Sequence, residues 1–422
     1  TAFITLVVVI ANHCRGKQQA GAVGWLGSAR AIGGVLAFVL VGFLAMINWR
    51  LAFALLIVHA GAILFLSFKL KNSEPNPAVK IDIVGVVLAA VAIILITFGF
   101  NNVRNWGLLL AGPNAPLDVL GMSPAPIMIL IGLVIGSGFL YWTHRTANAG
   151  GTPLLALEVV DSPREWAAVV TLFMIVSMEA AINFSVPLYI QIVQGRTSMA
   201  TSIAMMPFML TVFFTAILIV RLYDRYTPRQ IARAAFLLVM VGTCWLAFVA
   251  RNDWSVFPVI VGLITVGLGQ GALVTLLFNV LVTSARKELA SDVGSLRGVT
   301  QNLAAAVGTA LMGALLVGLV SSLINDKLID NPVIPAEFKT TELAEEFNLD
   351  SINFISNDQL ETRLANTNAT AEKVEEAVRI NTESRLTSLK IGFLVLSCLA
   401  LLALFPCRWL PDYRPGEIPA SK

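Results

Sequence analysis

Long apolar stretches alternate with short polar segments along most of the chain. Each stretch holds 18 to 28 residues, enough for a helix that rises 1.5 Å per residue to cross a hydrocarbon core of about 30 Å. The pattern predicts ten complete membrane-spanning helices, at residues 21–45, 50–68, 82–100, 125–143, 166–192, 198–221, 230–250, 256–283, 297–323 and 389–406. The apolar run 1–11 is too short to span a bilayer, so we expect it to be the end of a helix that begins upstream.

The composition favours an all-α polytopic membrane protein. Hydrophobic residues make up 57% of the chain and charged residues 13%, with a mean hydropathy of +0.79, whereas soluble domains carry about 25% charge. The four cysteines have no paired spacing, so we predict neither a disulfide nor a metal site. No phosphate-binding loop, zinc-protease motif or hydrolase nucleophile motif occurs, which argues against an enzyme and against a cofactor.

The distribution of Lys and Arg predicts how the chain is oriented in the membrane. If the loop around Arg15 is cytoplasmic, the loops on that side and the C-terminal tail carry 17 Lys and Arg, against 4 in the short loops on the other side. Cytoplasmic loops are enriched in these residues. We therefore expect a multi-pass protein of the inner (plasma) membrane with a cytoplasmic C-terminus.

The polar segment 324–387 differs from the rest of the chain because it holds 13 acids and only 6 bases. The loop charges place it outside the membrane. A helical stripe of Val374, Ala377 and Val378 follows a potential N-cap at Thr370. Two interpretations stay open, a solvated cap of short helices and a surface that binds a periplasmic partner.

Glu179 is the one acid in the apolar stretch from Trp166 to Gln194. A charge at this depth costs about 2.5–3.5 kcal/mol on insertion scales, and such residues usually face a bundle interior or an ion or substrate path. Asn183 lies one turn further on the same face, and Pro187 should bend the end of the helix. We predict that Glu179 couples proton movement and that Asn183 contacts substrate. The alternative is a structural hydrogen bond to a neighbouring helix.

Several sequence motifs occur in an order that matches one family of membrane proteins. They are RGKQQAGAVGWLGSARAIGG, INWRLAF, Asp82 with Gly85, Trp106-Gly107, PLYIQIVQGRTSMATSIAMMP and RLYDRYTPRQ. Together they resemble the major facilitator superfamily, and within it the fourteen-helix drug:proton antiporter branch that performs multidrug efflux. The resemblance covers essentially the whole chain.

The resemblance implies a major facilitator fold with two helix bundles and two extra central helices, and about three and a half missing N-terminal helices. It divides the chain into the remainder of the N-terminal bundle (1–68), the two central helices (69–165), the C-terminal bundle (166–323), the acidic segment (324–388) and the last helix with the cytoplasmic tail (389–422).

Two motifs depart from the family pattern. Ala37-Phe38 stands where the antiporter signature has Gly-Pro, so we expect this helix to be straighter than in the family, with a packing surface built by Gly33, Gly34 and Gly42. In RLYDRYTPRQ, Val220 and Thr227 replace glycines. The motif still implies a latch between helix ends, formed by the charged residues Asp224, Arg225 and Arg229.

The resemblance also suggests further site residues. Gln270, flanked by glycines in GLGQG, and Asn279 lie on a helix that lines the family's cavity, so both are candidates for substrate contact. Met178 and Phe184 fall near the same cavity and suit lipophilic ligands, although core packing is the alternative for each. Independently of the resemblance, Arg30 lies near the middle of its predicted helix, so we predict a proton-coupling role for it, with a structural pair as the alternative.

These observations lead to a functional hypothesis. We predict a proton-driven secondary active transporter that exports small lipophilic or cationic compounds by alternating access. Its partners would be a small-molecule substrate, protons and the lipid bilayer, with no nucleic acid. An importer or facilitator of an organic solute is the alternative. A non-transporting membrane receptor or assembly protein that uses the acidic segment is a third hypothesis.

Overall fold

The computed structural model describes residues 33, 36–37, 40–68, 82–107, 110–112, 115–117, 120–155, 157–160, 162–223, 225–251, 257–284, 290–329, 357, 360–362 and 370–412. Within these residues the regular elements are helices, with one isolated β-bridge between Leu110 and Met122. Nine of the described helices are long and apolar enough to cross a membrane. This finding confirms the predicted all-α polytopic class.

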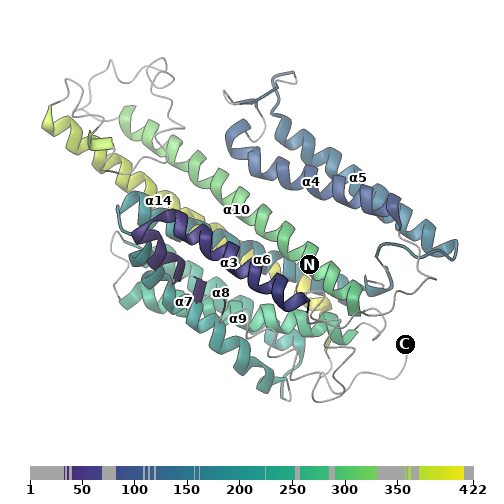
Figure 1. Cartoon of the computed structure of the whole chain (residues 1–422). Helices are drawn as coiled ribbons and strands as arrows, with labels where there is room; N and C mark the ends of the chain where they lie inside the picture. The colour runs from purple at the N-terminus through teal and green to yellow at the C-terminus, as the bar shows by residue number, and fades with distance from the viewer. Residues whose placement is uncertain are drawn as a thin grey trace.

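The long helices follow the predicted order of spans. They are α3 (Trp49–Ser67), α4 (Ile83–Trp106), α5 (Pro124–Asn148), α6 (Pro163–Leu188), α7 (Ser198–Leu218), α8 (Pro228–Val249), α9 (Phe257–Ser284), α10 (Ala290–Ile329) and α14 (Ala371–Ala403) (Figure 1). Each of the nine spans predicted from residue 50 onward lies on one of these helices. The predicted span 21–45 lies partly outside the described residues, and its described end, 40–47, is helical.

Helices α6 to α10 and α14 pack into one bundle with a continuous hydrophobic core (Figure 1). Phe208 from α7, Phe236 from α8 and Phe393 from α14 are fully buried in it. Helix α9 packs against α6, α7 and α8, so it runs through the interior of the bundle. Residues in the middle of α9 are therefore held at fixed positions relative to α6.

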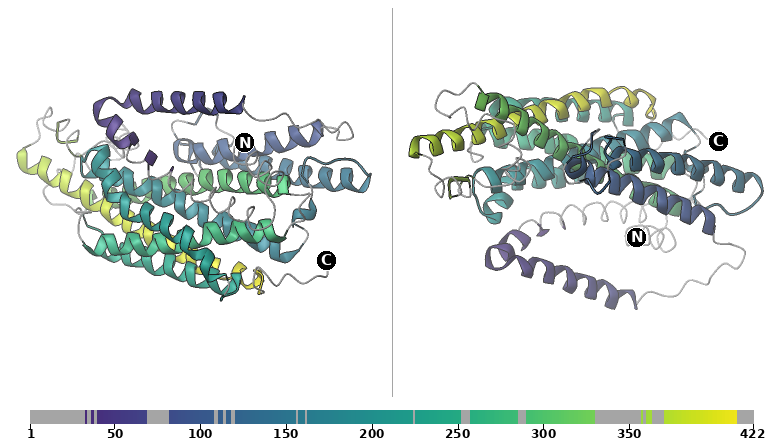
Figure 2. Two further views of the ribbon diagram at one scale, coloured as in Figure 1. Left: turned by 60° about the horizontal axis from the view of Figure 1, so that its bottom comes forward. Right: turned by 90° about the horizontal axis from the view of Figure 1, so that it is seen from above.

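Helices α4 and α5 form a hairpin that contacts α10 (Figures 1 and 2). Gly99 on α4 and Gly132 on α5 lie where the two helices cross. A Cβ added to Gly99 would lie 2.9 Å from the Ala125 carbonyl oxygen, and one added to Gly132 would lie 2.6 Å from the Ile96 side chain. Small residues at these positions let the two backbones approach closely.

Asp82 fixes the start of this hairpin. Its Oδ1 accepts hydrogen bonds from the Gly85 backbone N–H at 2.9 Å and the Trp142 indole at 3.0 Å, and its Oδ2 accepts one from the Leu154 N–H at 3.3 Å. Partial burial acts to raise the pKa of Asp82, but the three hydrogen bonds to the ionised form outweigh it and lower the pKa. Asp82 is thus an N-cap that also ties α4 to α5.

The N-terminal part of the described chain corrects one expectation. Gly42 is buried, and a Cβ there would collide with the Ser202 hydroxyl on α7, so Gly42 does form a packing surface. Gly33 has open space around it among the described residues, so the prediction that it packs is wrong. Gly34 and Phe38 lie outside the described residues. The prediction that this helix is straight at residues 36–39 therefore stays a prediction. Helix α3 has no buried residue and lies along the outside of the bundle (Figure 2).

Helix α14 corrects the predicted layout of the acidic segment. The sequence suggested short helices before a separate final span at 389–406, but α14 runs without a break over 33 residues after Thr370, whose extended backbone is that of an N-cap. At 1.5 Å per residue α14 is about 50 Å long, against a hydrocarbon core of about 30 Å. Its first turns therefore project beyond the membrane as a continuation of the last span.

Helix α10 also extends past its predicted end, and the two extensions are tied together. The last turns of α10 place Lys327 beside Glu383 of α14, with an N–O distance of 2.8 Å. Asn357 donates to the Val193 carbonyl at 3.0 Å and to the Thr382 hydroxyl at 2.9 Å. The end of α6, the end of α10 and the start of α14 therefore meet on one side of the bundle.

Candidate functional site

A hydrogen bond between α6 and α9 joins two of the predicted site residues. The Gln270 side-chain amide donates to Glu179 Oε2 at 2.9 Å and to the Ile175 carbonyl at 3.4 Å. Gln270 is fully buried and Glu179 is half-buried. Both residues lie near the middle of their helices. The structure therefore brings a carboxylate and an amide together inside the bundle formed by α6 to α10 and α14.

The glycines of GLGQG explain why Gln270 reaches α6. A Cβ on Gly267 would lie 2.9 Å from the Phe208 carbonyl of α7, and one on Gly271 would lie 2.5 Å from the Val212 carbonyl of α7. A Cβ on Gly269 would lie 2.5 Å from the Ala235 carbonyl of α8. These glycines let α9 lie close to both α7 and α8. Gln270, between Gly269 and Gly271, then points toward α6.

A second close contact holds α6 against α10. The Ser177 hydroxyl donates to the Ala304 carbonyl of α10 at 3.0 Å. Gly308, one turn further along α10, faces the Ser177 backbone so closely that an added Cβ would overlap it. Ser177 and Glu179 are two residues apart and therefore lie on different faces of α6. Helix α6 is held on both sides, by α9 at Glu179 and by α10 at Ser177.

The polar atoms around this contact have an imbalance between acceptors and donors. Gln270 Oε1 and Asn183 Oδ1 are buried, and neither has a hydrogen-bond partner among the described residues. Glu179 adds further acceptor capacity when it is ionised. Buried acceptors without donors are costly, so these two amide oxygens could each accept a hydrogen bond from a ligand or a protonated group. A proton on Glu179, or a ligand that carries N–H groups, would supply the donors.

The remaining predicted substrate residues lie away from the Glu179–Gln270 contact. Met178 is almost completely buried in the hydrophobic core, which favours core packing, the alternative stated for it. Phe184 lies against Gly313 of α10, and its ring is 3.5 Å from the point that a Cβ on this glycine would occupy. Asn279 follows Gln270 by nine residues and so lies on the opposite side of α9. Arg30 lies outside the described residues.

The loop motif RLYDRYTPRQ is in contact with the residues that follow α14. Arg229 forms an ion pair with Asp412 at 3.0 Å and donates from Nε to the Leu410 carbonyl at 3.1 Å. The Thr227 hydroxyl donates to Asp412 at 2.9 Å. Asp224 lies outside the described residues, and the Arg225 residue is exposed. Among the described residues, Arg229 joins this loop to the residues that follow α14, and the latch predicted for Asp224 and Arg225 stays a prediction.

Sequence reasoning missed two buried arginines, Arg297 on α10 and Arg385 on α14. Arg385 was assigned to the acidic outer segment, yet in α14 it is only 5% exposed and faces α6. A signal was present, because the stripe of Val374, Ala377 and Val378 continues at helical spacing through Asn381 and Arg385 into the last span. The net charge of the segment hid this continuation.

Comparison with known proteins places the fold in a family. The family model described as Major Facilitator Superfamily matches residues 1–309. The chain is 24% identical over 322 residues to a probable actinorhodin transporter of Streptomyces coelicolor, a match that covers 72% of this chain and 52% of that relative.

Two further relatives are named for multidrug resistance. A putative multidrug resistance protein, MdtD, of Yersinia enterocolitica is 26% identical over 247 residues, which are 56% of this chain and 47% of the relative. The multidrug resistance protein Stp of Mycobacterium tuberculosis is 22% identical over 417 residues, 96% of this chain and 72% of the relative. The chain spans about half the length of the first two of these three relatives.

Proposed function

Because the chain belongs to the Major Facilitator Superfamily, we propose that it exports small lipophilic or cationic compounds by alternating access, driven by inward proton flow. The names of its relatives support an efflux role, since one is called a probable actinorhodin transporter and two are called multidrug resistance proteins. The single observation that carries the mechanism is the hydrogen bond from Gln270 to Glu179 across α6 and α9.

Glu179 has the features required of a coupling carboxylate. It is half-buried in the middle of a membrane-spanning helix. Among the described residues its side-chain partner is an uncharged amide rather than a base. A neutral partner lets the carboxyl change its protonation state without leaving a second buried charge behind. The buried acceptors of Asn183 and Gln270 favour a ligand that brings hydrogen-bond donors.

Competition for one carboxylate couples the two movements. A proton bound to Glu179 from the outside lowers its affinity for a cationic substrate, and a substrate bound from the inside prevents protonation. One elementary charge that crosses about 150 mV releases roughly 3.5 kcal/mol, at about 2.3 kcal/mol per 100 mV. That free energy sustains a concentration gradient of about 300-fold, at about 1.4 kcal/mol per tenfold step.

The test measures protonophore-sensitive efflux of a cationic dye in vesicles that contain the full-length protein at matched expression. Glu179→Gln mimics the protonated acid, so we expect normal insertion and the loss of proton-driven export. Glu372→Gln is the matched control, because Glu372 is an exposed acid in the first turn of α14. This control should export the dye at the parental rate.

Three outcomes would contradict the proposal. If vesicles with Glu179→Gln export dye as fast as the parent under the same pH gradient, the carboxylate is structural. If the parent accumulates dye in the opposite direction, the importer hypothesis is favoured. Dye movement that does not respond to the pH gradient in the parent would exclude proton coupling for this dye.

A further inference from the structure

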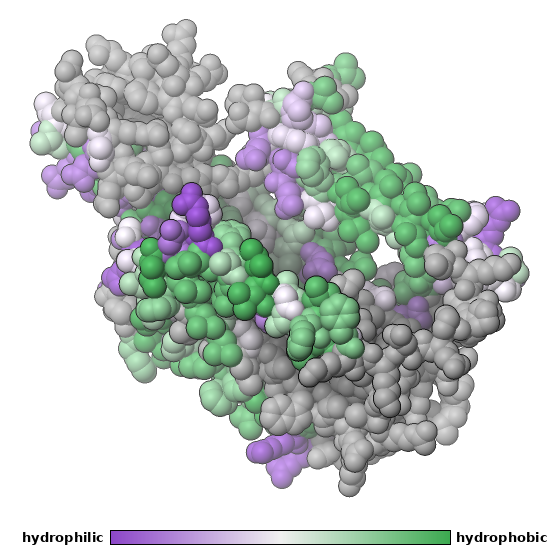
Figure 3. All heavy atoms as spheres, viewed as in Figure 1, coloured by the Kyte–Doolittle hydropathy of each residue, from purple (hydrophilic) through white to green (hydrophobic). Residues whose placement is uncertain are grey.

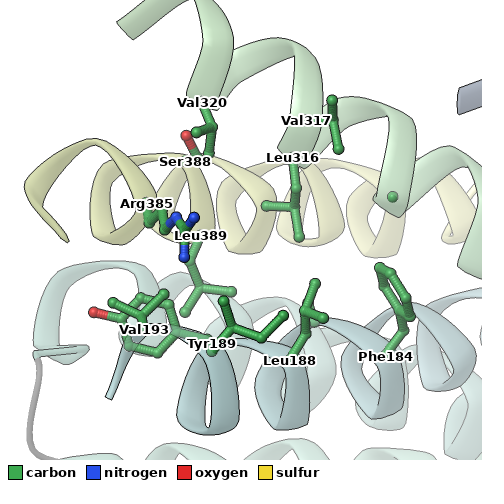
Figure 4. A pocket seen from close by; sticks show the side chains of 13 residues that line it. Phe184, Leu188, Tyr189, Val193, Leu316, Val317, Val320, Arg385, Ser388 and Leu389 are labelled. Carbon is green, nitrogen blue, oxygen red and sulfur yellow. The ribbon is translucent and has the colours of Figure 1, made fainter. Parts of the chain in front are cut away.

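A small pocket lies between α6, α10 and α14, on the side of the bundle where the α10 and α14 extensions begin. Most of its wall is apolar, with Phe184, Leu188 and Val193 from α6 and the turn that follows, Leu316, Val317 and Val320 from α10, and Leu389 from α14 (Figure 4). The polar residues in the wall are Ser185, Tyr189, Arg385 and Ser388.

Two of these four polar residues are open to a ligand. Arg385 and Tyr189 already interact with other groups of the protein. The Ser185 residue is 1% exposed, and its hydroxyl has no hydrogen-bond partner among the described residues. Ser388 donates to the Ser384 carbonyl at 2.8 Å, so its own oxygen can still accept a hydrogen bond. The pocket therefore offers an unpartnered hydroxyl on α6 and an acceptor oxygen on α14.

The α6 wall of the pocket is not a regular α-helix. Pro187 lies inside the last turns of α6, and residues Tyr189–Val193 form a turn of π-helix. Such turns are frequent at functional sites. Here the π-helical turn places both Tyr189 and Val193 in the pocket wall, so the local irregularity of the helix shapes the pocket itself.

The size of the pocket limits what it can hold. Its volume is about 50 Å³, room for a few water-sized groups and well below the roughly 300–1,000 Å³ of sites that enclose drug-sized ligands. The pocket is therefore too small to enclose a drug-sized substrate. It is large enough for one polar group and a few carbons.

The balance of donors and acceptors selects the polar group. A buried water makes about three hydrogen bonds, whereas the two serines supply about two and most of the remaining wall is apolar. A charged head group needs an opposite charge that is still free, and Arg385 already has interactions within the protein. An alcohol fits, because its oxygen accepts from Ser185, its O–H donates to Ser388, and its carbons need no polar partner.

We propose that this pocket binds the hydroxyl end of a neutral single-chain alcohol. The hydroxyl bridges Ser185 and Ser388 across α6 and α14, and the first carbons of the chain contact Leu188, Leu316 and Val317. A free alkanol and the glycerol hydroxyl of a monoacylglycerol in the bilayer offer the same chemistry, and the experiment separates these two sources.

The experiment is photo-crosslinking of the full-length protein with an eight-carbon primary alcohol that carries a diazirine, followed by mass-spectrometric mapping. We expect labels on peptides that contain residues 184–193, 313–320 and 385–389. Labelling is expressed relative to that of α3, which has no buried residue. An alkane of the same length with the same diazirine should label the pocket more weakly on this scale.

Substitutions at Ser185 test the role of the hydroxyl. Ser185→Ala should reduce labelling of the pocket by the alcohol about twofold to tenfold, as expected for the loss of one neutral hydrogen bond. Ser185→Thr keeps the hydroxyl and should retain labelling. Ser137→Ala is the matched control, because Ser137 is exposed on α5 and donates to the Leu133 carbonyl of its own helix.

A second variant keeps the test valid if Ser185→Ala does not fold. Val317→Phe fills the pocket from α10 and leaves both serines in place, and it should also reduce labelling. Competition by unlabelled octanol but not by a monoacylglycerol in the bilayer assigns the site to free alcohols, and the reverse assigns it to lipid.

Four results would overturn the proposal. They are equal relative labelling by the alcohol and the alkane, labelling that Ser185→Ala and Val317→Phe leave unchanged, stronger labelling by an eight-carbon carboxylate probe than by the alcohol, and no labelling of the pocket in the folded parent. The last result would show that the pocket holds water only. None of these readouts depends on transport, so the proposal can fail or hold independently of the proposed efflux function.

Discussion

At the scale of single residues, the chemistry centres on one amide and one carboxyl. Gln270 is the donor that satisfies Glu179, and it is held in place by glycines on both sides. The two residues are 91 positions apart in the chain. Their pairing therefore depends on the packing of α6 against α9. The effects of substitutions at the two residues on the free energy of unfolding should therefore be coupled.

A double-mutant cycle measures this coupling. Gln270→Leu leaves the Glu179 carboxyl without its donor, so we expect a loss of about 1–3 kcal/mol in the free energy of unfolding. The double variant Glu179→Leu with Gln270→Leu removes both partners and should be close to the parent. The measurement is the midpoint of heat unfolding in detergent for the parent, both single variants and the double variant. Additive effects of the two single changes would show that the bond contributes no coupling.

The sequence singles out Glu179 and Gln270 as candidates but does not show that they pair. Glu179 stands out because it is an isolated acid in an apolar stretch, and Gln270 because it lies among glycines. Neither feature predicts which side of α9 faces α6. That rotation of α9 depends on how Gly267, Gly269 and Gly271 pack against α7 and α8. Met178 illustrates the opposite case, since a methionine next to Glu179 in the sequence points into the core instead.

At the scale of elements, close helix contacts are made where glycine replaces a side chain. Gly269→Ala should be destabilising, because its Cβ would lie 2.5 Å from the Ala235 carbonyl and α9 would have to shift away from α8. Overpacking of this kind costs about 1–3 kcal/mol. We expect a lower midpoint of heat unfolding and, since Gln270 is adjacent, slower dye efflux.

Gly138→Ala on α5 is the matched control for this substitution. A Cβ at Gly138 meets nothing within 4 Å, and alanine is favoured over glycine in a helix by about 1 kcal/mol. The control should therefore be neutral or slightly stabilising in the same heat-unfolding assay. If Gly138→Ala and Gly269→Ala lower the midpoint equally, close approach at Gly269 is not the cause, because helix propensity favours alanine at both positions.

The cap of α4 gives a prediction that depends on pH. Asp82→Ala removes three hydrogen bonds, and the loss of an N-cap alone costs about 1 kcal/mol, whereas Asp82→Asn should retain much of the cap. The pKa of Asp82 in the folded chain lies below its usual value of 3.8. Its contribution is therefore fully present above that pH and is lost as the pH falls through the lowered pKa.

The check is the difference in heat-unfolding midpoint between the parent and Asp82→Ala at several pH values. This difference should be constant from pH 7 down to about pH 4 and should shrink below that. A difference that already shrinks between pH 7 and pH 5 would show that another group is responsible. Asp82→Asn should show little dependence on pH over the same range.

The layout of the last helix shows where a sequence pattern is ambiguous. Residues 371–388 are rich in charge, so composition separates them from the apolar span that follows. The backbone has no such boundary, because no proline or glycine interrupts the sequence between Ala371 and Lys390. Helix α14 is therefore continuous. Arg385 is buried because it lies on the side of α14 that faces the bundle, although the segment as a whole is charged.

At the scale of the whole molecule, each end of the bundle has its own set of contacts between segments. The loop before α8 and the residues after α14 meet through Arg229 and Asp412. The other end of α14 meets the end of α6 through Asn357. Because these contacts lie at opposite ends of a 33-residue helix, the loop motif and the α10–α14 extensions lie at opposite ends of the bundle.

The exposed polar residues in the space-filling view likewise gather toward the ends of the helices, with apolar surface between them (Figure 3). This arrangement agrees with the separation that the Lys and Arg counts predicted.

The assignment of these ends to the cytoplasm and the exterior is the last prediction. Tyr226 lies in the loop before α8 and Glu361 lies between α10 and α14, and both are exposed. Each is replaced by cysteine, as Tyr226→Cys and Glu361→Cys, in a variant from which the four native cysteines have been removed. A membrane-impermeant maleimide should label Glu361→Cys in intact cells and Tyr226→Cys only after the membrane is opened, because loops rich in Lys and Arg stay in the cytoplasm.

The reverse labelling pattern would show that the orientation of the protein in the membrane is inverted. A proton that enters from outside would then approach Glu179 from the end of α6 near the loop motif, and the direction proposed for transport would have to be reversed with it.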